Sequence, residues 1–397
     1  MRDDFVAWAE VDLDAIAHNV AAIKRHVGDR VTVIAVVKAN GYGHGMEAAA
    51  RTALQNGASW LALNHVSPAI ALRRRGIQAP ILLLGYLPPA VAPSVVEHDL
   101  RPALTTWELA QALSAAAQAA GKEVPYHVKV DTGMGRFGLM PAEVVEFVRA
   151  LSRLPGLRLE GVFTHFACAD WADGCWVDRQ LALYHDVLQE LQSAGITVPM
   201  RHVANSAATL ARPDTHLDAV RVGIALYGLH PSLQVAPCIP LRPALTLKSR
   251  VAQVRTLPPG SGISYGRTYV TPNTARMALV PCGYGDGLMR IISNRGAVLI
   301  RGQRAPIRGR VTMDTMVAEV THIPDVCVGD EVVIIGRQGD DVISAEEVAA
   351  WAETINYEVV THLLPRLPRV YRRDGRVVAV SEELFAEGLF SSELSPV

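Results

Sequence analysis

The chain has 397 residues, of which 50% are hydrophobic and 19% are charged. This composition excludes a disordered chain and supplies enough apolar residues for two or three domains, or for one large barrel with a smaller domain. The 38 Lys and Arg residues nearly balance the 39 Asp and Glu residues, so no excess of charge points to nucleic acid as a partner.

Cysteine usage and the N-terminus indicate a cytoplasmic protein. The five cysteines form no Cys-x-x-Cys pair, so neither a disulfide framework nor a zinc ribbon is expected. The segment Met1–Phe5 carries acids where a signal peptide needs basic and then apolar residues. The most apolar stretch, Pro80–Val96, is interrupted by glycine and prolines and cannot span a bilayer. We therefore expect a reduced, soluble protein without a metal site.

Short apolar runs alternate with helical stretches rich in Ala and Leu from about residue 30 to residue 225. Eight strands are predicted, at Val31–Val37, Trp60–Leu63, Ile81–Leu84, Pro102–Leu104, Tyr126–Val130, Leu159–Phe163, Met200–Val203 and Leu217–Val222. The predicted helices between them include Met46–Gln55, Trp107–Ala120, Ala142–Leu154 and Asp178–Ala194. Eight such units in one domain length favour a (β/α)8 TIM-like barrel over a doubly wound sheet, which has the same local pattern.

A second, mostly-β domain is predicted after the proline-rich segment Pro237–Pro243. Its strand patterns lie at Leu245–Val254, Arg276–Val280, Ala297–Ile300, Met316–Val320 and Glu331–Ile335. A capping-box sequence at Ser344–Glu347 predicts one helix over Ala345–Thr354. The expected division is an N-terminal strand at residues 1–12 that packs on the second domain, a barrel at residues 13–238 and a β domain at residues 239–397.

Lys38 ends the first predicted strand and precedes the glycine-rich segment Ala39–Gly45. Active sites of barrels lie at the C-terminal ends of the strands, which would direct the amine into the mouth. Burial there lowers the pKa of a lysine and prepares the amine for Schiff-base chemistry. The alternative is a surface lysine whose amine extends into water.

The segment Gly133–Gly138 matches the GxGxxG fingerprint of dinucleotide-binding loops. Pro141 delays the next helix, and a barrel lacks the crevice that such loops serve, so a nicotinamide cofactor is not expected. The loops Asn205–Ala207 and Arg221–Ile224 follow the last two strands, where barrels often bind phosphate. Their alternative is an ordinary asparagine helix cap beside a glycine turn.

Two further residues, His165 and Tyr265, are weaker candidates. His165, at the end of the sixth strand, is either a ligand-facing ring or a hydrogen-bonded core histidine. Tyr265 follows a glycine-rich turn in the second domain, where a packed aromatic at the rim is the commoner role.

These motifs, in this order, resemble those of the alanine racemases, which depend on pyridoxal 5'-phosphate and combine an N-terminal (β/α)8 barrel with a C-terminal β domain. The similarity runs from Val11–Leu13 to Arg366–Tyr371 and is most specific in Val37–Gly45. Asp131–Arg136 and Gly262–Gly266 also match the family.

The resemblance implies racemisation of L- and D-alanine by two bases, Lys38 and Tyr265, on opposite faces of the cofactor. Lys38 would hold the cofactor covalently, and Tyr265 would come from the partner of a homodimer. The implied cofactor contacts are Lys38, Tyr42, His165, Asn205, Ser206, Arg221, Gly223, Ile224 and Tyr357. The implied substrate contacts are Arg136, Tyr284 and, from the partner, Met313 and Asp314; Lys129 is a candidate for carbamylation.

Arg221 would face the pyridine nitrogen, and a guanidinium only donates hydrogen bonds, so that nitrogen would stay unprotonated. This argues against a barrel decarboxylase, which needs an acid there. The open alternatives are a racemase of broader specificity, with serine as one substrate, and a non-catalytic pyridoxal-phosphate-binding barrel. The sequence departs from the family at Gly41, Val222 and Asn64–Ser67 without losing a catalytic group. It leaves open whether the enzyme makes D-alanine or degrades it.

Overall fold

The computed structural model describes residues 5–232, 234 and 238–381, so residues 1–4 and 382–397 of the predicted domains and Pro237 of their boundary lie outside it. The chain divides into two compact units. The barrel unit consists of Ala15–Gly41 and Met46–Pro243. The β unit consists of the segment that ends at Asp14, Tyr42–Gly45 and the chain from Ala244 onward.

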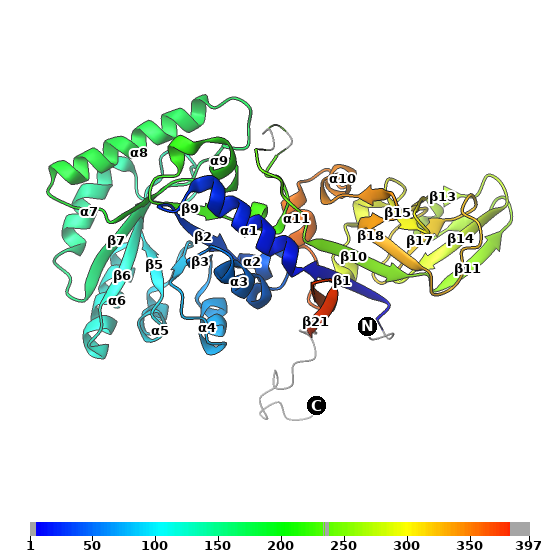
Figure 1. Ribbon diagram of the computed structural model, residues 1–397, viewed down its shortest axis with the longest axis horizontal. Helices are drawn as coiled ribbons and strands as arrows, with labels where there is room; N and C mark the ends of the chain where they lie inside the picture. The colour runs from blue at the N-terminus through cyan, green and yellow to red at the C-terminus, as the bar shows by residue number, and fades with distance from the viewer. Residues whose placement is uncertain (1–4, 233, 235–237, 382–397) are drawn as a thin grey trace. The chain divides into compact units, whose positions relative to one another are not determined.

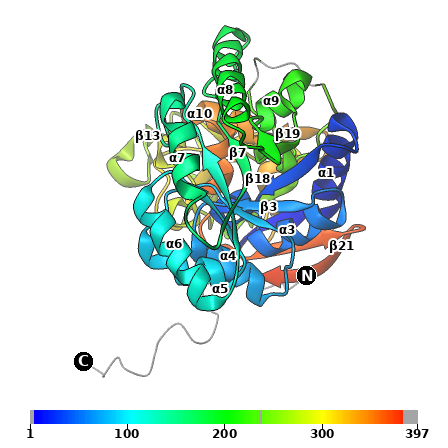
Figure 2. The same cartoon turned by 90° about the vertical axis from the view of Figure 1, so that its left-hand side faces the viewer.

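Eight parallel strands form a nearly closed barrel, so the predicted (β/α)8 fold is confirmed (Figures 1 and 2). Their order is β8-β7-β6-β5-β4-β3-β2-β9, and the Arg221 amide donates to the Ala204 carbonyl (3.0 Å) where the last two strands meet. The strands are β2 (Thr32–Val36), β3 (Trp60–Leu63), β4 (Ile81–Leu83), β5 (Arg101–Leu104), β6 (Val124–Lys129), β7 (Leu157–Phe163), β8 (Met200–His202) and β9 (Ala219–Val222). Each predicted strand is present, with its ends shifted by no more than two residues.

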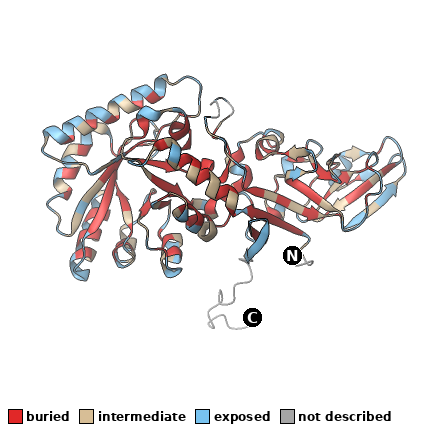
Figure 3. Ribbon diagram, viewed as in Figure 1, coloured by how far each residue is buried: buried red, intermediate tan, exposed pale blue. Residues whose placement is uncertain are grey.

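The helices of this unit pack outside the strands, with buried inner faces and exposed outer faces (Figures 2 and 3). They are α1 (Leu13–Val27), α3 (Met46–Gln55), α4 (Val66–Arg74), α5 (Ala92–Glu97), α6 (Trp107–Ala120), α7 (Val144–Leu151), α8 (Cys175–Ser193) and α9 (Ser206–Ala211). The helix predicted at Ala142–Leu154 is shorter, because a 3-10 turn at Pro141–Glu143 precedes it. α1 was not predicted, although Ile16, Val20 and Ile23 recur at helical spacing and are buried.

The β unit is built on an eight-stranded sheet of order β16-β15-β18-β10-β1-β20-β21, with β19 on β18, so the mostly-β prediction is confirmed. β1 (Ala7–Asp12) pairs antiparallel with β10 (Leu245–Arg250) and parallel with β20 (Arg369–Arg373). The other strands of this sheet are β15 (Ala297–Ile300), β16 (Gln303–Pro306), β18 (Glu331–Gln338), β19 (Asp341–Ile343) and β21 (Arg376–Ser381).

Smaller elements complete the β unit. β11 (Gln253–Leu257), β14 (Ala275–Val280) and β17 (Met316–Glu319) form a separate sheet, and β12 (Gly262–Ile263) pairs with β13 (Tyr269–Val270). The single strand predicted at Leu245–Val254 is therefore wrong, because the chain leaves one sheet after Arg250 and enters another at Gln253. Two short helices, α10 (Ala345–Trp351) and α11 (Asn356–Thr361), follow, and the Ser344 hydroxyl caps α10 as predicted (3.1 Å to the Glu347 amide). Within the described ranges, no helix has the length and apolar character needed to cross a membrane.

Candidate active site

Lys38 opens a left-handed turn, α2 (Lys38–Tyr42), at the end of β2. Ala39, Asn40, Gly41 and Tyr42 have φ angles of 51°, 52°, 61° and 51°. The Gly41 amide donates to the Val37 carbonyl (3.0 Å), and the Asn40 side chain accepts from the Met46 amide (2.8 Å). Consecutive left-handed L-residues cost free energy and are retained mainly at functional positions. The turn therefore marks the end of β2 as a site.

Gly41→Ala should lower the free energy of unfolding by about 1 kcal/mol, because only glycine adopts a left-handed conformation freely. A Cβ at residue 41 would also lie 3.3 Å from the Cβ of Ala49 and from the Cα of Met46. Gly76→Ala is the matched control, since Gly76 has a φ of 83° and open space around it. Urea unfolding should show the larger loss for Gly41→Ala, and equal losses would contradict the crowding at residue 41.

A cavity of about 720 Å³ lies at the C-terminal ends of the barrel strands, and Lys38 is part of its wall. Its size suits a small ligand or cofactor. Its lining consists of Lys38, Ala39, Asn40, Met46, Leu63, Asn64, His65, Pro68, Leu84, Gly85, Tyr86, Lys129, Arg136 and Phe137. This lining holds three cationic residues and no carboxylate, so the cavity favours an anionic ligand. Among the described residues, no group of three or more His, Cys, Asp or Glu is placed to hold a metal ion.

The two lysines of this cavity have lowered pKa values. Burial, and then the charge of Arg136, lower the pKa of Lys38, which raises the share of neutral amine. Burial lowers the pKa of Lys129 to about 8, although Asp131 opposes the shift. The Lys129 ammonium donates to the Phe137 carbonyl and lies 5.0 Å from the centre of the Phe137 ring.

The GxGxxG segment is folded around one carboxylate. Asp131 accepts hydrogen bonds from the amides of Gly133 (2.9 Å), Met134 (2.8 Å), Gly135 (3.1 Å) and Arg136 (3.0 Å). A dinucleotide fingerprint would aim such amides at a pyrophosphate instead. The segment therefore serves to turn the chain after β6 and to place Arg136 at the cavity.

Arg221 is buried at the end of β9 and is surrounded by acceptors. Its Nη1 lies 2.9 Å from His202 Nδ1 and donates to the His202 carbonyl (2.9 Å). Its Nη2 donates to the carbonyls of Thr164 (2.6 Å) and Val203 (3.0 Å) and lies 3.3 Å from His165 Nδ1. Burial lowers the pKa of Arg221 to about 10, so the guanidinium remains charged at neutral pH. Burial, and then Arg221, lower the pKa of His165 well below its usual value.

A chain of side chains continues from Arg221 through the barrel interior. His202 Nε2 lies 2.8 Å from His127 Nδ1, and His127 Nε2 lies 3.4 Å from Glu160 Oε2. Because a guanidinium only donates, His202 Nδ1 must accept, and its Nε2 must carry the proton donated to His127. His127 then donates to the carboxylate. All hydrogen bonds of this row therefore point in one direction, from the Arg221 cation to the Glu160 anion. Burial lowers the pKa of both histidines, which keeps them neutral.

The free energy of unfolding should fall as the pH drops below about 6.5, the pKa of histidine in the unfolded chain. Below that pH the two histidines bind protons in the unfolded state, whereas His127 and His202 stay neutral in the folded state because their pKa values are lowered. The free energy of unfolding therefore decreases as the pH decreases. Each such proton contributes about 1.4 kcal/mol per pH unit. The free energy of unfolding of His202→Leu, measured with urea at several pH values, should depend on pH less steeply than that of the unmodified protein, by the contribution of one proton. An unchanged dependence on pH would contradict the neutral state of His202.

The two late barrel loops are brought together. The Ser206 hydroxyl accepts from the Gly223 amide (2.9 Å), and Ile224 begins a 3-10 turn at Ile224–Tyr227. The Asn205 side chain accepts from the Ala208 amide (3.0 Å) and therefore caps α9, which is the alternative interpretation of this residue. Ser206, Gly223 and Ile224 thus form one cluster, whereas the Asn205 oxygen is used within its helix.

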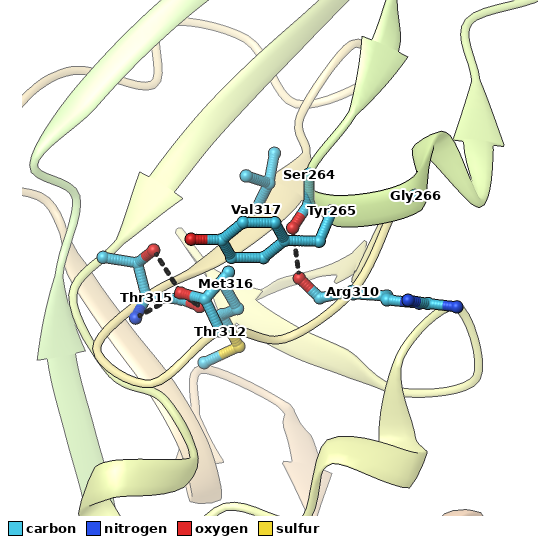
Figure 4. A pocket seen from close by; sticks show the side chains of 8 residues that line it. All are labelled: Ser264, Tyr265, Gly266, Arg310, Thr312, Thr315, Met316 and Val317. Carbon is cyan, nitrogen blue, oxygen red and sulfur yellow. Dashed lines mark hydrogen bonds between the residues drawn. The ribbon is translucent and has the colours of Figure 1, made fainter.

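Other predicted residues lie in the β unit. Tyr42 and Tyr357 have ring centres 6.3 Å apart, and burial raises the pKa of Tyr42 to about 12. Tyr265 and Met313 are 72% and 53% exposed in the single chain, which leaves both side chains available to a ligand or a second molecule. Tyr265 lines a pocket of about 510 Å³ (Figure 4).

Sequence reasoning missed two residues that organise predicted ones. Gln180 in α8 is buried, donates to the His165 carbonyl (3.1 Å) and accepts from the Ala167 amide (2.9 Å). Arg366 bonds Asp286 (2.7 Å) and Asp314 (2.8 Å), and so joins the loops that carry Tyr284 and Asp314. Neither residue belongs to a local motif, so only their contacts reveal them.

Two family models match the chain: "Alanine racemase, N-terminal domain" at residues 11–231 and "Alanine racemase, C-terminal domain" at residues 244–371. The alanine racemase of Desulfosudis oleivorans is 49% identical over 93% of this chain and 97% of its own. That of Symbiobacterium thermophilum is 49% identical over 92% of this chain and 96% of its own.

Solved structures agree with these matches. The alanine racemase of Bacillus anthracis, crystallised with bound L-Ala-P, superposes with a TM-score of 0.91 at 42% identity, covering 96% of this chain and 98% of that one. The histidine racemase of Leuconostoc mesenteroides superposes with a TM-score of 0.85 at 29% identity, covering 93% of this chain and 99% of that one.

Proposed function

The chain belongs to the alanine racemase family, and we propose that it interconverts L- and D-alanine at the cavity around Lys38 with pyridoxal 5'-phosphate as its cofactor. The observation that carries this proposal is the position of the Lys38 amine in a cavity lined by other cations. Its lowered pKa increases the share of neutral, nucleophilic amine. A second observation supports it: the buried, donor-only Arg221 lies at the end of a neighbouring strand.

The described residues fit this cofactor. Lys38 would hold its aldehyde carbon covalently, and the cluster of Ser206, Gly223 and Ile224 would hold its phosphate, together with Tyr42 and Tyr357. Asn205 would support this cluster by capping α9 with its side-chain oxygen rather than by contacting the cofactor. Arg221 would face the ring nitrogen and His165 would pack near the ring. When bound, the cofactor supplies an electron sink that acidifies the α-hydrogen of an amino acid.

Racemisation removes the α-proton from one side and returns a proton to the other, so two fixed bases need no movement around the substrate. Lys38 would take the proton from D-alanine, and Tyr265 of the partner subunit would take it from L-alanine. Arg136 would orient the substrate carboxylate. Met313 and Asp314 of the partner subunit would line the substrate site, and Tyr284 would shape its entry. Arg221 can only donate, so the ring nitrogen would stay unprotonated, which would limit side reactions.

We propose that the enzyme lies in the cytoplasm and supplies D-alanine. We also propose that it is a homodimer. The support for the homodimer is the exposure of the Tyr265 and Met313 side chains in the single chain, because a catalytic base needs a site around it.

We also propose that Lys129 is carbamylated and orients Arg136. Carbon dioxide reacts with a neutral amine, and a pKa of about 8 leaves a share of the Lys129 amine neutral near physiological pH. Enzyme equilibrated with 13C-bicarbonate should show a carbamate carbon resonance that Lys129→Arg lacks. Lys122→Arg, an exposed lysine of the same unit, is the control. A spectrum without that resonance would contradict the modification.

The decisive test of the function combines a visible spectrum with two substrates. The purified enzyme should show an absorbance band that borohydride abolishes, with the mass of the cofactor retained on the peptide that contains Lys38. L-alanine and D-alanine should each be converted to an equal mixture. A band without racemisation would identify a non-catalytic binding barrel, whereas equal kcat/KM for serine would identify a racemase of broader specificity. The structural similarity to a histidine racemase makes that second comparison worthwhile.

A further inference from the structure

The backbone around Tyr265 has an unusual conformation. Ser264 has φ 58° and ψ −173°, a combination that is essentially confined to glycine. Gly266 and Arg267, on the other side of Tyr265, also have positive φ angles, of 72° and 46°. An L-residue stays in such a conformation only where its surroundings hold it there.

A side-chain hydrogen bond helps to hold Ser264, whose carbonyl also accepts from the Arg267 amide (3.2 Å). Its hydroxyl donates to the Arg310 carbonyl at 2.6 Å (Figure 4). The segment that carries this carbonyl is fixed on both sides, because the Gly309 amide donates to Asn294 Oδ1 (2.6 Å) and the Val311 amide donates to Ser293 Oγ (2.9 Å). The acceptor for Ser264 therefore has a defined position.

Close packing holds the same turn from its other sides. Ile263 is buried in a cluster with Ala275 and Met277. A Cβ on Gly309 would lie 2.6 Å from the Ile263 carbonyl oxygen, and a Cβ on Gly266 would lie 3.2 Å from Arg310 Nη1. The turn is thus clamped against the 309–311 segment before and after Tyr265.

The Tyr265 side chain itself is 72% exposed, so its own packing does little to set its direction within the single chain. We propose that Ser264 is a positioning residue for Tyr265: its hydroxyl, bonded to the Arg310 carbonyl, holds the strained backbone that aims the phenol oxygen at the substrate. This inference rests on the proposed role of Tyr265 as one of two bases.

Ser264→Ala removes the bond and leaves an L-residue in the strained conformation. It should lower kcat about tenfold to a hundredfold with little change in KM, because a misplaced base slows proton transfer more than binding. Tyr265 is the proposed base that removes the α-proton from L-alanine, whereas Lys38 removes it from D-alanine. Slower proton removal by Tyr265 should therefore raise the deuterium isotope effect with L-[2-2H]alanine relative to that with D-[2-2H]alanine. Ser264→Gly should keep more activity, and should unfold at a higher temperature than Ser264→Ala, because glycine adopts the conformation freely.

Ser261→Ala is the matched control, since the Ser261 hydroxyl also donates to a carbonyl of the same hairpin (2.8 Å to Pro258) but holds no strained residue. It should leave the ratio of the two isotope effects unchanged. An unchanged ratio in Ser264→Ala, with or without a loss of activity, would overturn the proposal. If the alanine variant does not fold, Ser264→Gly, which also lacks the hydroxyl, should change the ratio in the same direction but by less, and an unchanged ratio there would overturn the proposal. A fully active Tyr265→Phe enzyme would instead show that the proposed function of Tyr265 is wrong.

Discussion

Lys38→Ala is expected to reduce racemisation of alanine at least about a thousandfold, because the change removes a nucleophile and a proton acceptor together. The peptide containing residue 38 should also no longer retain the cofactor after borohydride treatment. Both results follow from the same amine, whose pKa is lowered by burial and by Arg136. Conversion of L-alanine to D-alanine, followed by circular dichroism, measures the first, and mass spectrometry measures the second.

Lys122→Ala is the control for this change, since Lys122 is an exposed lysine of the same unit that donates to the carbonyls of Val96 and Glu97. It should keep full activity and full labelling. Small amines added to Lys38→Ala should restore part of the activity, because the cavity around residue 38 has room for them. Retention of cofactor on another lysine, with activity preserved, would place the site elsewhere.

Tyr265→Phe is the second large effect. It should lower racemisation about a thousandfold or more while the cofactor remains bound, because the phenol oxygen is lost but the ring is kept. Lys38 would still serve D-alanine from its own side. In deuterium oxide the variant should therefore exchange the α-hydrogen of D-alanine without forming L-alanine, and proton NMR would follow both.

The matched control is Tyr269→Phe, because Tyr269 lies in the same hairpin and its hydroxyl donates to Glu319 (3.3 Å) away from the proposed chemistry. It should racemise alanine normally. Loss of α-hydrogen exchange from both enantiomers in Tyr265→Phe would argue for a single base or for a collapsed site, and normal racemisation would exclude Tyr265 as a base.

Much of the barrel was predictable because its signals are local. Each barrel strand is an apolar run bounded by turns, and the alternation of eight such runs with helices favours a barrel. Lys38 was predictable for the same reason, since it ends a strand and precedes a glycine-rich segment. The β unit was harder: β12, β13, β16, β19, β20 and β21 were not predicted, because they are short or sit near turns.

The sequence alone determined the strands and helices of the barrel unit and the family motifs, because these depend on neighbouring residues and their spacing. The pairing order that distinguishes a barrel from a doubly wound sheet was decided by the tertiary structure. Only the tertiary structure decided that the amides of Gly133–Arg136 face Asp131, and that Asn205 caps a helix. The same holds for the chain from Arg221 to Glu160 and for the clamp between Ser264 and Arg310, whose members lie 46 residues apart. The physical reason is that the role of a side chain depends on the residues that contact it in the folded protein. Contacts between residues distant along the chain produce no regular spacing in the sequence from which they could be predicted.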